Sequence, residues 1–196
     1  IYASCGISPN DIPGNTEEIF SLAKQDKVVA IGEIGLDYYW NKENKKEQKE
    51  IFCDQIEIAN QLRKPIVIHA RDAVQDIIEV LKEKPADEKG VFHCIQLNPE
   101  LVKQALKLDF FVSFAGSITF KNSKNADEII KMVPLEKMLI ETDCPYLAPE
   151  PVRGTRNDSR NVKYTAQKIA QVKQKQLEEI AKITYQNAET IFKINK

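Results

Sequence analysis

The sequence predicts an α/β fold in which helices cover a parallel β-sheet. Two observations support this prediction. Short apolar runs rich in Val, Ile and Phe alternate along the chain with longer segments of helical periodicity. The apolar runs are continuous rather than alternating, as is typical of strands that are covered on both faces. A parallel sheet follows because each strand is separated from the next by a helix-length crossover.

Six apolar runs are predicted as strands, because each is short and most are rich in β-branched or aromatic residues. They span residues 1–7, 28–34, 65–69, 91–95, 110–114 and 138–140. Seven segments with apolar residues at helical spacing are predicted as helices. They span residues 16–24, 46–62, 72–82, 99–108, 126–132, 163–172 and 177–192. The helix at 99–108 also has a start signal, since Asn98 suits the N-cap and Pro99 the first helical position.

The number of strands bears on the architecture. An eight-unit TIM-type (β/α) barrel takes about 250 residues, whereas this chain has 196 residues and six predicted strands. The chain also begins at Ile1 inside an apolar run. We therefore expect an incomplete barrel that lacks two βα units and forms a single domain over residues 1–196, with an open doubly wound sheet as the alternative. Its unpaired strand edges predict self-association.

Composition limits the classes of partner. The chain is 42% hydrophobic and 29% charged, with a formal net charge of −1, so any contact with phosphates must be local. No apolar run approaches the roughly 18 residues of a membrane span, and we expect no membrane partner. The four cysteines are widely separated and form no CxxC pair. This pattern favours reduced thiols in a cytoplasmic protein over a disulfide framework or a zinc knuckle.

Ionisable residues stand where four of the predicted strands end. Glu33 follows the apolar residues 28–32, His69 follows 65–68 and His93 follows 91–92, whereas Asp143 comes shortly after the run at 138–140. The carboxyl ends of parallel strands are where ligands bind in α/β folds. Both histidines of the chain stand at such an end, which favours a shared role. Two imidazoles with two carboxylates suit a divalent ion such as Zn, Mn or Mg.

Four sequence blocks carry a family resemblance. They are GEIGLDYY at 32–39, PIVIHARD at 65–72, VFHC at 91–94 and ETDCPYLAP at 141–149. Together they resemble the signature blocks of the TatD-type metal-dependent deoxyribonucleases, in the same order and over essentially the whole chain. The resemblance implies a hydrolase barrel of the amidohydrolase-like superfamily that cleaves DNA phosphodiester bonds, with 3′ to 5′ exonuclease action typical of the family.

The resemblance also implies roles for individual residues. Glu33, His69, His93 and Asp143 match the family's metal ligands, which hold two divalent ions with the Glu as a bridge. Asp143 is the expected general base that takes a proton from the attacking water, and Glu33 is the second expected catalytic residue. DNA, specifically its single-stranded ends, is the expected partner.

Two departures from the family pattern change these expectations. The family's first strand, which carries a His-x-His pair, and its second strand have no counterpart, so residues 1–9 match the third strand and strands 3–8 are present. The chain therefore retains ligands mainly for one ion. The block Gly-Ile-His-Pro-His is replaced by GISPN at 6–10. Ser8 and Asn10 are expected to contact substrate there by hydrogen bonds.

Basic and aromatic side chains complete the expected site. Arg71 shares strand parity with His69, and Arg156 lies in the loop after the last strand, so both are expected to bind phosphates. Tyr38, Tyr39, Trp40 and Tyr146 follow two of the ligand-bearing strands, and they either stack on unpaired bases or pack a loop over the barrel rim. Two alternatives to the deoxyribonuclease remain: a catalytically impaired or inactive remnant of the family, and a related metal hydrolase acting on a small lactone or amide.

Overall fold

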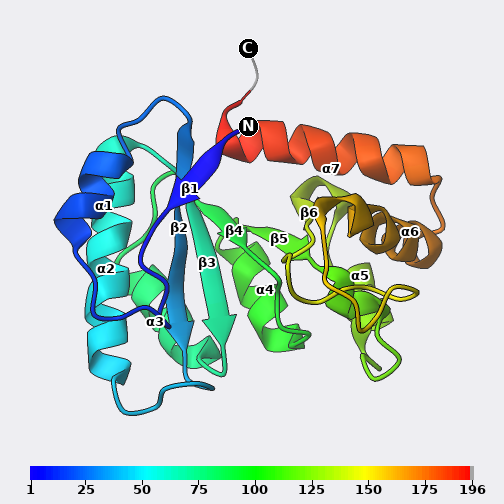
Figure 1. Ribbon diagram of the computed structural model, residues 1–196, viewed down its shortest axis with the longest axis horizontal. Helices are drawn as coiled ribbons and strands as arrows, with labels where there is room; N and C mark the ends of the chain where they lie inside the picture. The colour runs from blue at the N-terminus through cyan, green and yellow to red at the C-terminus, as the bar shows by residue number, and fades with distance from the viewer. Residues whose placement is uncertain (195–196) are drawn as a thin grey trace. The chain divides into compact units, whose positions relative to one another are not determined.

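The structure, a computed structural model, describes residues 1–194 (Figure 1). Strands and helices alternate along these residues, which confirms the predicted α/β class. The chain divides into two compact units. The first comprises Ile1–Phe92 with the chain from Ile191, and the second comprises His93–Thr190. That the strands belong to a barrel without its first two βα units, within one domain, stays a prediction.

The first unit is built on four strands that pair in parallel and in chain order. Its elements are β1 (Ala3–Cys5), α1 (Thr16–Leu22), β2 (Val28–Asp37), α2 (Lys45–Leu62), β3 (Ile66–Arg71), α3 (Val74–Glu83) and β4 (Gly90–Phe92). Figure 1 shows α1 and α2 beside one another, and α2 packs against β2.

Fully buried apolar side chains hold this unit together. Ile31 and Leu36 of β2 and Ile68 of β3 have no exposed surface, and neither has Phe52 on the face of α2. Each such side chain contributes roughly 1.5–3 kcal/mol through removal of apolar surface from water. The continuous apolar runs of the sequence are thus explained by strands at the centre of a sheet.

The strand β2 is longer than the sequence predicted. The apolar run was expected to end at Ile34, but Gly35, Leu36 and Asp37 continue the pairing, opposite His69, Ala70 and Arg71. Backbone hydrogen bonding to β3 therefore extends the strand beyond its hydrophobic part. As a result Glu33 and His69 lie inside their strands, and the expectation that these strands end at them is wrong. His93 does follow β4 directly.

The second unit contains two parallel strands and most of the C-terminal helices. Its elements are α4 (Pro99–Lys107), β5 (Phe111–Phe114), α5 (Ala126–Met132), β6 (Met138–Ile140), α6 (Val162–Lys173) and α7 (Leu177–Phe192), with short 3-10 turns at Gly116–Thr119, Leu135–Lys137 and Ser159–Asn161. Val112 of β5 is paired with Met138 of β6. Asn98 caps α4 by accepting the N–H groups of Glu100 and Leu101, as predicted.

Two further observations concern the whole described chain. Within residues 1–194, no helix combines the length and the apolar character that crossing a membrane requires. The four cysteines are free thiols, of which Cys144 is exposed and the other three are half-buried.

Candidate metal centre

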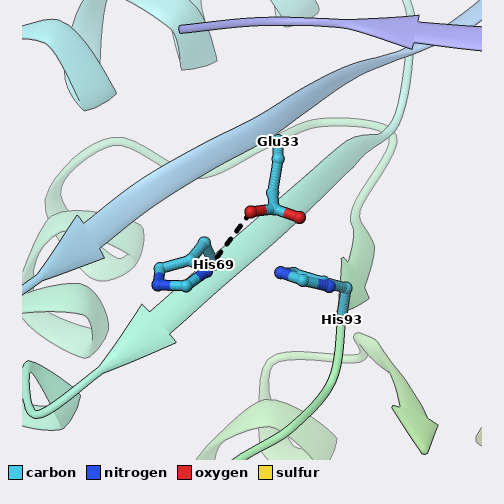
Figure 2. Close-up of side chains that lie close together, drawn as sticks. All are labelled: Glu33, His69 and His93. Carbon is cyan, nitrogen blue, oxygen red and sulfur yellow. Dashed lines mark ion pairs between the residues drawn. The ribbon is translucent and has the colours of Figure 1, made fainter. Parts of the chain in front are cut away.

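Three of the predicted ligands come together. One ligand atom each from Glu33, His69 and His93 lies within 4.8 Å of the others. Figure 2 shows the two imidazole rings turned towards the Glu33 carboxylate. Glu33 belongs to β2, His69 to β3, and His93 follows β4. The side chains are half-buried, which leaves the group accessible to a substrate.

An irregularity in β2 places Glu33. Ile31 is paired with Ile66 and Ile34 with Ile68, so that Gly32 and Glu33 together stand opposite a single residue of β3. Such an extra residue is typical of a β-bulge, which redirects a side chain out of the regular alternation. Gly32 permits it, because a Cβ at that position would lie 2.5 Å from the Cβ of Val67.

A second glycine brings β2 close to His69. Gly35 has a φ of +136°, and a Cβ there would lie 2.1 Å from the backbone oxygen of His69. Only glycine satisfies both conditions. Gly32 and Gly35 therefore both serve the close packing of β2 against the backbone of β3.

His69 is held between two carboxylates. Its Nδ1 lies 3.3 Å from Oε2 of Glu33, and its Nε2 lies 2.9 Å from Oδ2 of Asp37. Burial of Asp37 opposes its ionisation, but hydrogen bonds from the Trp40 backbone, His69 and Asn10 outweigh burial and hold the pKa of this carboxyl below its usual value. An ionised Asp37 accepts a hydrogen bond from an N–H at Nε2 of His69. In this tautomer the lone pair is on Nδ1 of His69, which faces the ligand group.

The backbone of Asp37 is itself clamped by α2. The side-chain oxygen of Gln48 accepts the Asp37 N–H at 2.9 Å, and its nitrogen donates to the Asp37 carbonyl at 3.1 Å. Gln48 and Asp37 have no exposed surface. A helix residue therefore fixes the carboxylate that orients His69.

His93 has an equivalent partner in Glu141, the residue after β6. Nδ1 of His93 lies 3.4 Å from Oε2 of Glu141, whose other oxygen accepts the backbone N–H of Cys94. Burial would raise the pKa of Glu141, but hydrogen bonds from His93, the Cys94 backbone and Ser113 hold it below its usual value. An ionised Glu141 beside Nδ1 leaves Nε2 of His93 as the ligand atom.

The sequence did not single out Asp37 and Glu141 as site residues. One signal was available in the sequence. Asp37 and Glu141 are acidic residues near the carboxyl ends of strands, and each lies in one of the four blocks that resemble the family. Their role depends on which imidazole nitrogen each one contacts, and that is set by tertiary packing.

Asp143 was the fourth expected ligand. It lies in the loop after β6 with a φ of +55°, and its carbonyl accepts the N–H of Tyr146 at 2.9 Å. The group of ligand atoms found among the described residues consists of Glu33, His69 and His93 and does not include Asp143. Its ligation of a metal stays a prediction.

The expected substrate-binding residues occupy different surroundings. Asn10 donates to Oδ2 of Asp37 at 3.3 Å, and the hydroxyl of Ser8 accepts the Asn10 N–H. Arg71 ends β3 and lies over the ring of Tyr39, 3.8 Å from its centroid. Arg156 is exposed in the loop that follows β6. The structure thus connects Asn10 and Arg71 with the surroundings of His69, whereas substrate binding by all four residues stays a prediction.

The donor set fits a divalent cation. Two imidazoles and one carboxylate supply nitrogen and oxygen ligands, which suit Zn or Mn and also allow Mg. Each imidazole is backed by an ionised carboxylate, the arrangement that fixes the tautomer and raises the basicity of a metal-ligating histidine.

Known proteins share both the sequence and the fold. The chain is 46% identical over 200 residues to the uncharacterized metal-dependent hydrolase YabD of Bacillus subtilis strain 168, covering 100% of this chain and 78% of YabD. It is 41% identical over 199 residues to the uncharacterized metal-dependent hydrolase YcfH of Escherichia coli K12, covering 100% and 75%. The crystal structure of YJJV, a TatD homologue from Escherichia coli K12, superposes with a TM-score of 0.91 at 22% identity, covering 99% of this chain and 77% of YJJV.

The family assignment rests on nearly the whole sequence. Residues 1–193 match the family described as TatD related DNase, and the relatives above are similar over the full length of the chain. The resemblance stated from the four sequence blocks is thereby confirmed: the chain belongs to the TatD related DNase family.

Proposed function

We propose that the chain is a divalent-metal-dependent hydrolase that cleaves DNA phosphodiester bonds, with 3′ to 5′ action on single-stranded ends. The observation that carries this proposal is the convergence of Glu33, His69 and His93, with a carboxylate behind each imidazole. The description of the matching family as a DNase supports DNA as the substrate. The names of the relatives support metal-dependent hydrolysis.

The residues of the group would hold one divalent ion. When bound, such an ion supplies Lewis-acid stabilisation of charge on a phosphoryl oxygen and makes a water more acidic. Asp37 keeps the His69 ring in its orientation, and Glu141 does the same for His93. Glu33 acts as a catalytic carboxylate in addition to its role as a ligand.

Residues around the group would handle the proton and the phosphates. Asp143 takes the proton of the attacking water at its carboxylate, and it is the proposed fourth ligand. The guanidinium groups of Arg71 and Arg156 bind phosphates that flank the scissile bond. Ser8 and Asn10 bind substrate through their polar side chains. The resemblance implies two ions in the family, whereas this group accounts for one.

The proposal is tested by metal content and DNA cleavage on the same preparations. We expect about one Zn or Mn per chain by elemental mass spectrometry, and metal-dependent stepwise shortening of a 5′-labelled single-stranded oligonucleotide from its 3′ end. Glu33→Gln and His69→Ala should lose the metal and the activity. The exposed Glu43→Gln is the matched control and should retain them.

Two alternatives have their own outcomes in this test. Turnover of a small lactone or amide, without release of nucleotides from DNA, would identify a related metal hydrolase with another substrate. Metal binding by the Glu33 group without turnover of any of these substrates would identify a catalytically inactive relative. Either result would overturn the DNase proposal while retaining the metal centre.

A further inference from the structure

An aromatic and cationic cluster lies beside the metal-ligand group. Tyr39 and Trp40 follow β2 directly, and their rings meet edge to face with centroids 4.9 Å apart. The Arg71 guanidinium lies 3.8 Å from the Tyr39 centroid and 5.5 Å from the Trp40 centroid. We refer to these three residues as the Arg71 platform.

The platform is exposed and carries a positive charge. Tyr39 is 51% exposed and Trp40 is 68% exposed, so both residues are open to solvent. Among the described residues, no acidic side chain forms an ion pair with Arg71. Loop packing alone would bury these rings, whereas open aromatic faces beside a cation are suited to a planar, anionic ligand.

The platform is fixed to the ligand group through one carboxylate. Oδ1 of Asp37 accepts the backbone N–H groups of Tyr39 at 2.9 Å and Trp40 at 3.1 Å. Oδ2 of the same carboxylate contacts Nε2 of His69. Arg71 is paired with Asp37 across the two strands and follows His69 by two residues, which places both on one face of β3.

We infer that the Arg71 platform is a subsite for one unpaired nucleotide of the DNA substrate. The base stacks on the Trp40 ring, and Arg71 donates hydrogen bonds to an adjoining phosphate while it stacks on Tyr39. Base–aromatic stacking tolerates any base, because every base offers a π-face. The inference rests on the proposed function, and it adds a contact that selects single-stranded over double-stranded DNA, since a paired base cannot reach the ring.

Trp40 is the only tryptophan of the sequence, so intrinsic tryptophan fluorescence reports on the platform alone. The full chain is titrated in EDTA at low salt with an oligothymidylate, and separately with an abasic oligomer of the same length and charge. We expect saturable quenching by the oligothymidylate and at least severalfold weaker quenching by the abasic oligomer. Equal quenching by both oligomers, or no saturable quenching by either, would overturn the inference.

Variants separate stacking from charge. By anisotropy of a labelled oligothymidylate, Trp40→Ala should weaken binding about tenfold, whereas Trp40→Phe should retain most of it. Tyr185→Ala, at a tyrosine that is 64% exposed on α7, is the matched control and should bind normally. Arg71→Ala should weaken binding and reduce its salt dependence. Circular dichroism confirms that each variant is folded.

Cleavage by the metal-loaded protein is measured separately, which distinguishes the two proposals. Nucleotide release that is unchanged in Trp40→Ala would overturn the platform and leave the proposed function standing. Quenching that depends on the base, without any DNA cleavage, would support the platform and overturn the proposed function. Unchanged binding by Trp40→Ala contradicts the subsite in either case.

Discussion

The imidazole Nε2 of His69 lies 2.9 Å from Oδ2 of Asp37, a carboxylate that has no exposed surface. This contact determines which nitrogen of His69 is available as a ligand, and it orients the ring towards Glu33. The carboxylate is held in turn by two backbone N–H groups and by Asn10. The metal-ligand group therefore depends on residues that would not themselves contact an ion.

Replacement of Asp37 should weaken metal binding without removing a ligand. We expect Asp37→Asn to lower the affinity for Zn by about 10- to 100-fold, as is typical of such outer partners. Competition with a chromophoric chelator measures the change. Asp76→Asn is the control, because Asp76 accepts the hydroxyl of Tyr38 and contacts Lys49 outside the group. Equal affinities of Asp37→Asn and the native protein would contradict the role of Asp37.

Two buried glutamines of α2 provide a second, matched comparison. Gln48 holds the backbone of Asp37, whereas Gln55 holds the backbone N–H and carbonyl of Ile7. Replacement of either by Ala leaves buried backbone groups without partners and should lower the free energy of unfolding by about 2–3 kcal/mol. Only Gln48→Ala should also weaken metal binding. Urea denaturation and chelator competition together test this, and an equal loss of affinity in both variants would count against the clamp.

Substitution of Gly35 and of Gly154 by Ala distinguishes the cost of an unfavourable φ from the cost of steric overlap. Both have a positive φ, but a Cβ at Gly35 would overlap the His69 backbone, whereas nothing lies within 4 Å of one at Gly154. Gly154→Ala should cost about 1–2 kcal/mol of stability from its conformation alone. Gly35→Ala should cost about 3 kcal/mol or more, because β2 and β3 must also move apart. Thermal unfolding of the two variants gives the comparison, and similar melting temperatures would refute the close approach.

The cysteines should differ in reactivity. Burial raises the pKa of the Cys5 thiol and of the Cys53 thiol, so that less thiolate is present at a given pH and both react slowly. Cys144 is exposed and should react first with a disulfide reagent at mildly alkaline pH. Mass mapping of the labelled peptides identifies the order. Cys144→Ser should lack the fast phase, and a fast phase that persists in this variant would be inconsistent with the structure.

The sequence predicted the fold class because its apolar runs are local features that report burial directly. The carboxyl end of β2 could not be obtained in this way. Gly35 is a poor strand former, and its place in β2 comes from pairing with His69. Sequence periodicity contains no information about a partner strand, so the strand was predicted to end three residues too early.

The site was predicted as far as residue type allowed. Glu33, His69 and His93 were found because each stands at or near the carboxyl end of an apolar run, and the structure brings them together. Asp37 and Glu141 were not predicted as site residues, because their function depends on a hydrogen bond to one particular ring nitrogen. Such a relationship is fixed by the packing of separate elements and has no pattern along the chain.

The extra residue in β2 supplies a candidate metal ligand, but the pairing of β2 with β3 does not require it. Gly32 and Glu33 stand opposite one residue of β3, so the sheet holds one residue more than its ladder requires. A deletion at this point would give a more regular strand that still pairs with β3 but has lost its carboxylate. An insertion that makes the sheet less regular is what equips it with a ligand. Chains of this fold that have lost the extra residue should therefore be stable proteins without a metal, and sequence comparison alone could recognise them by the length of this strand.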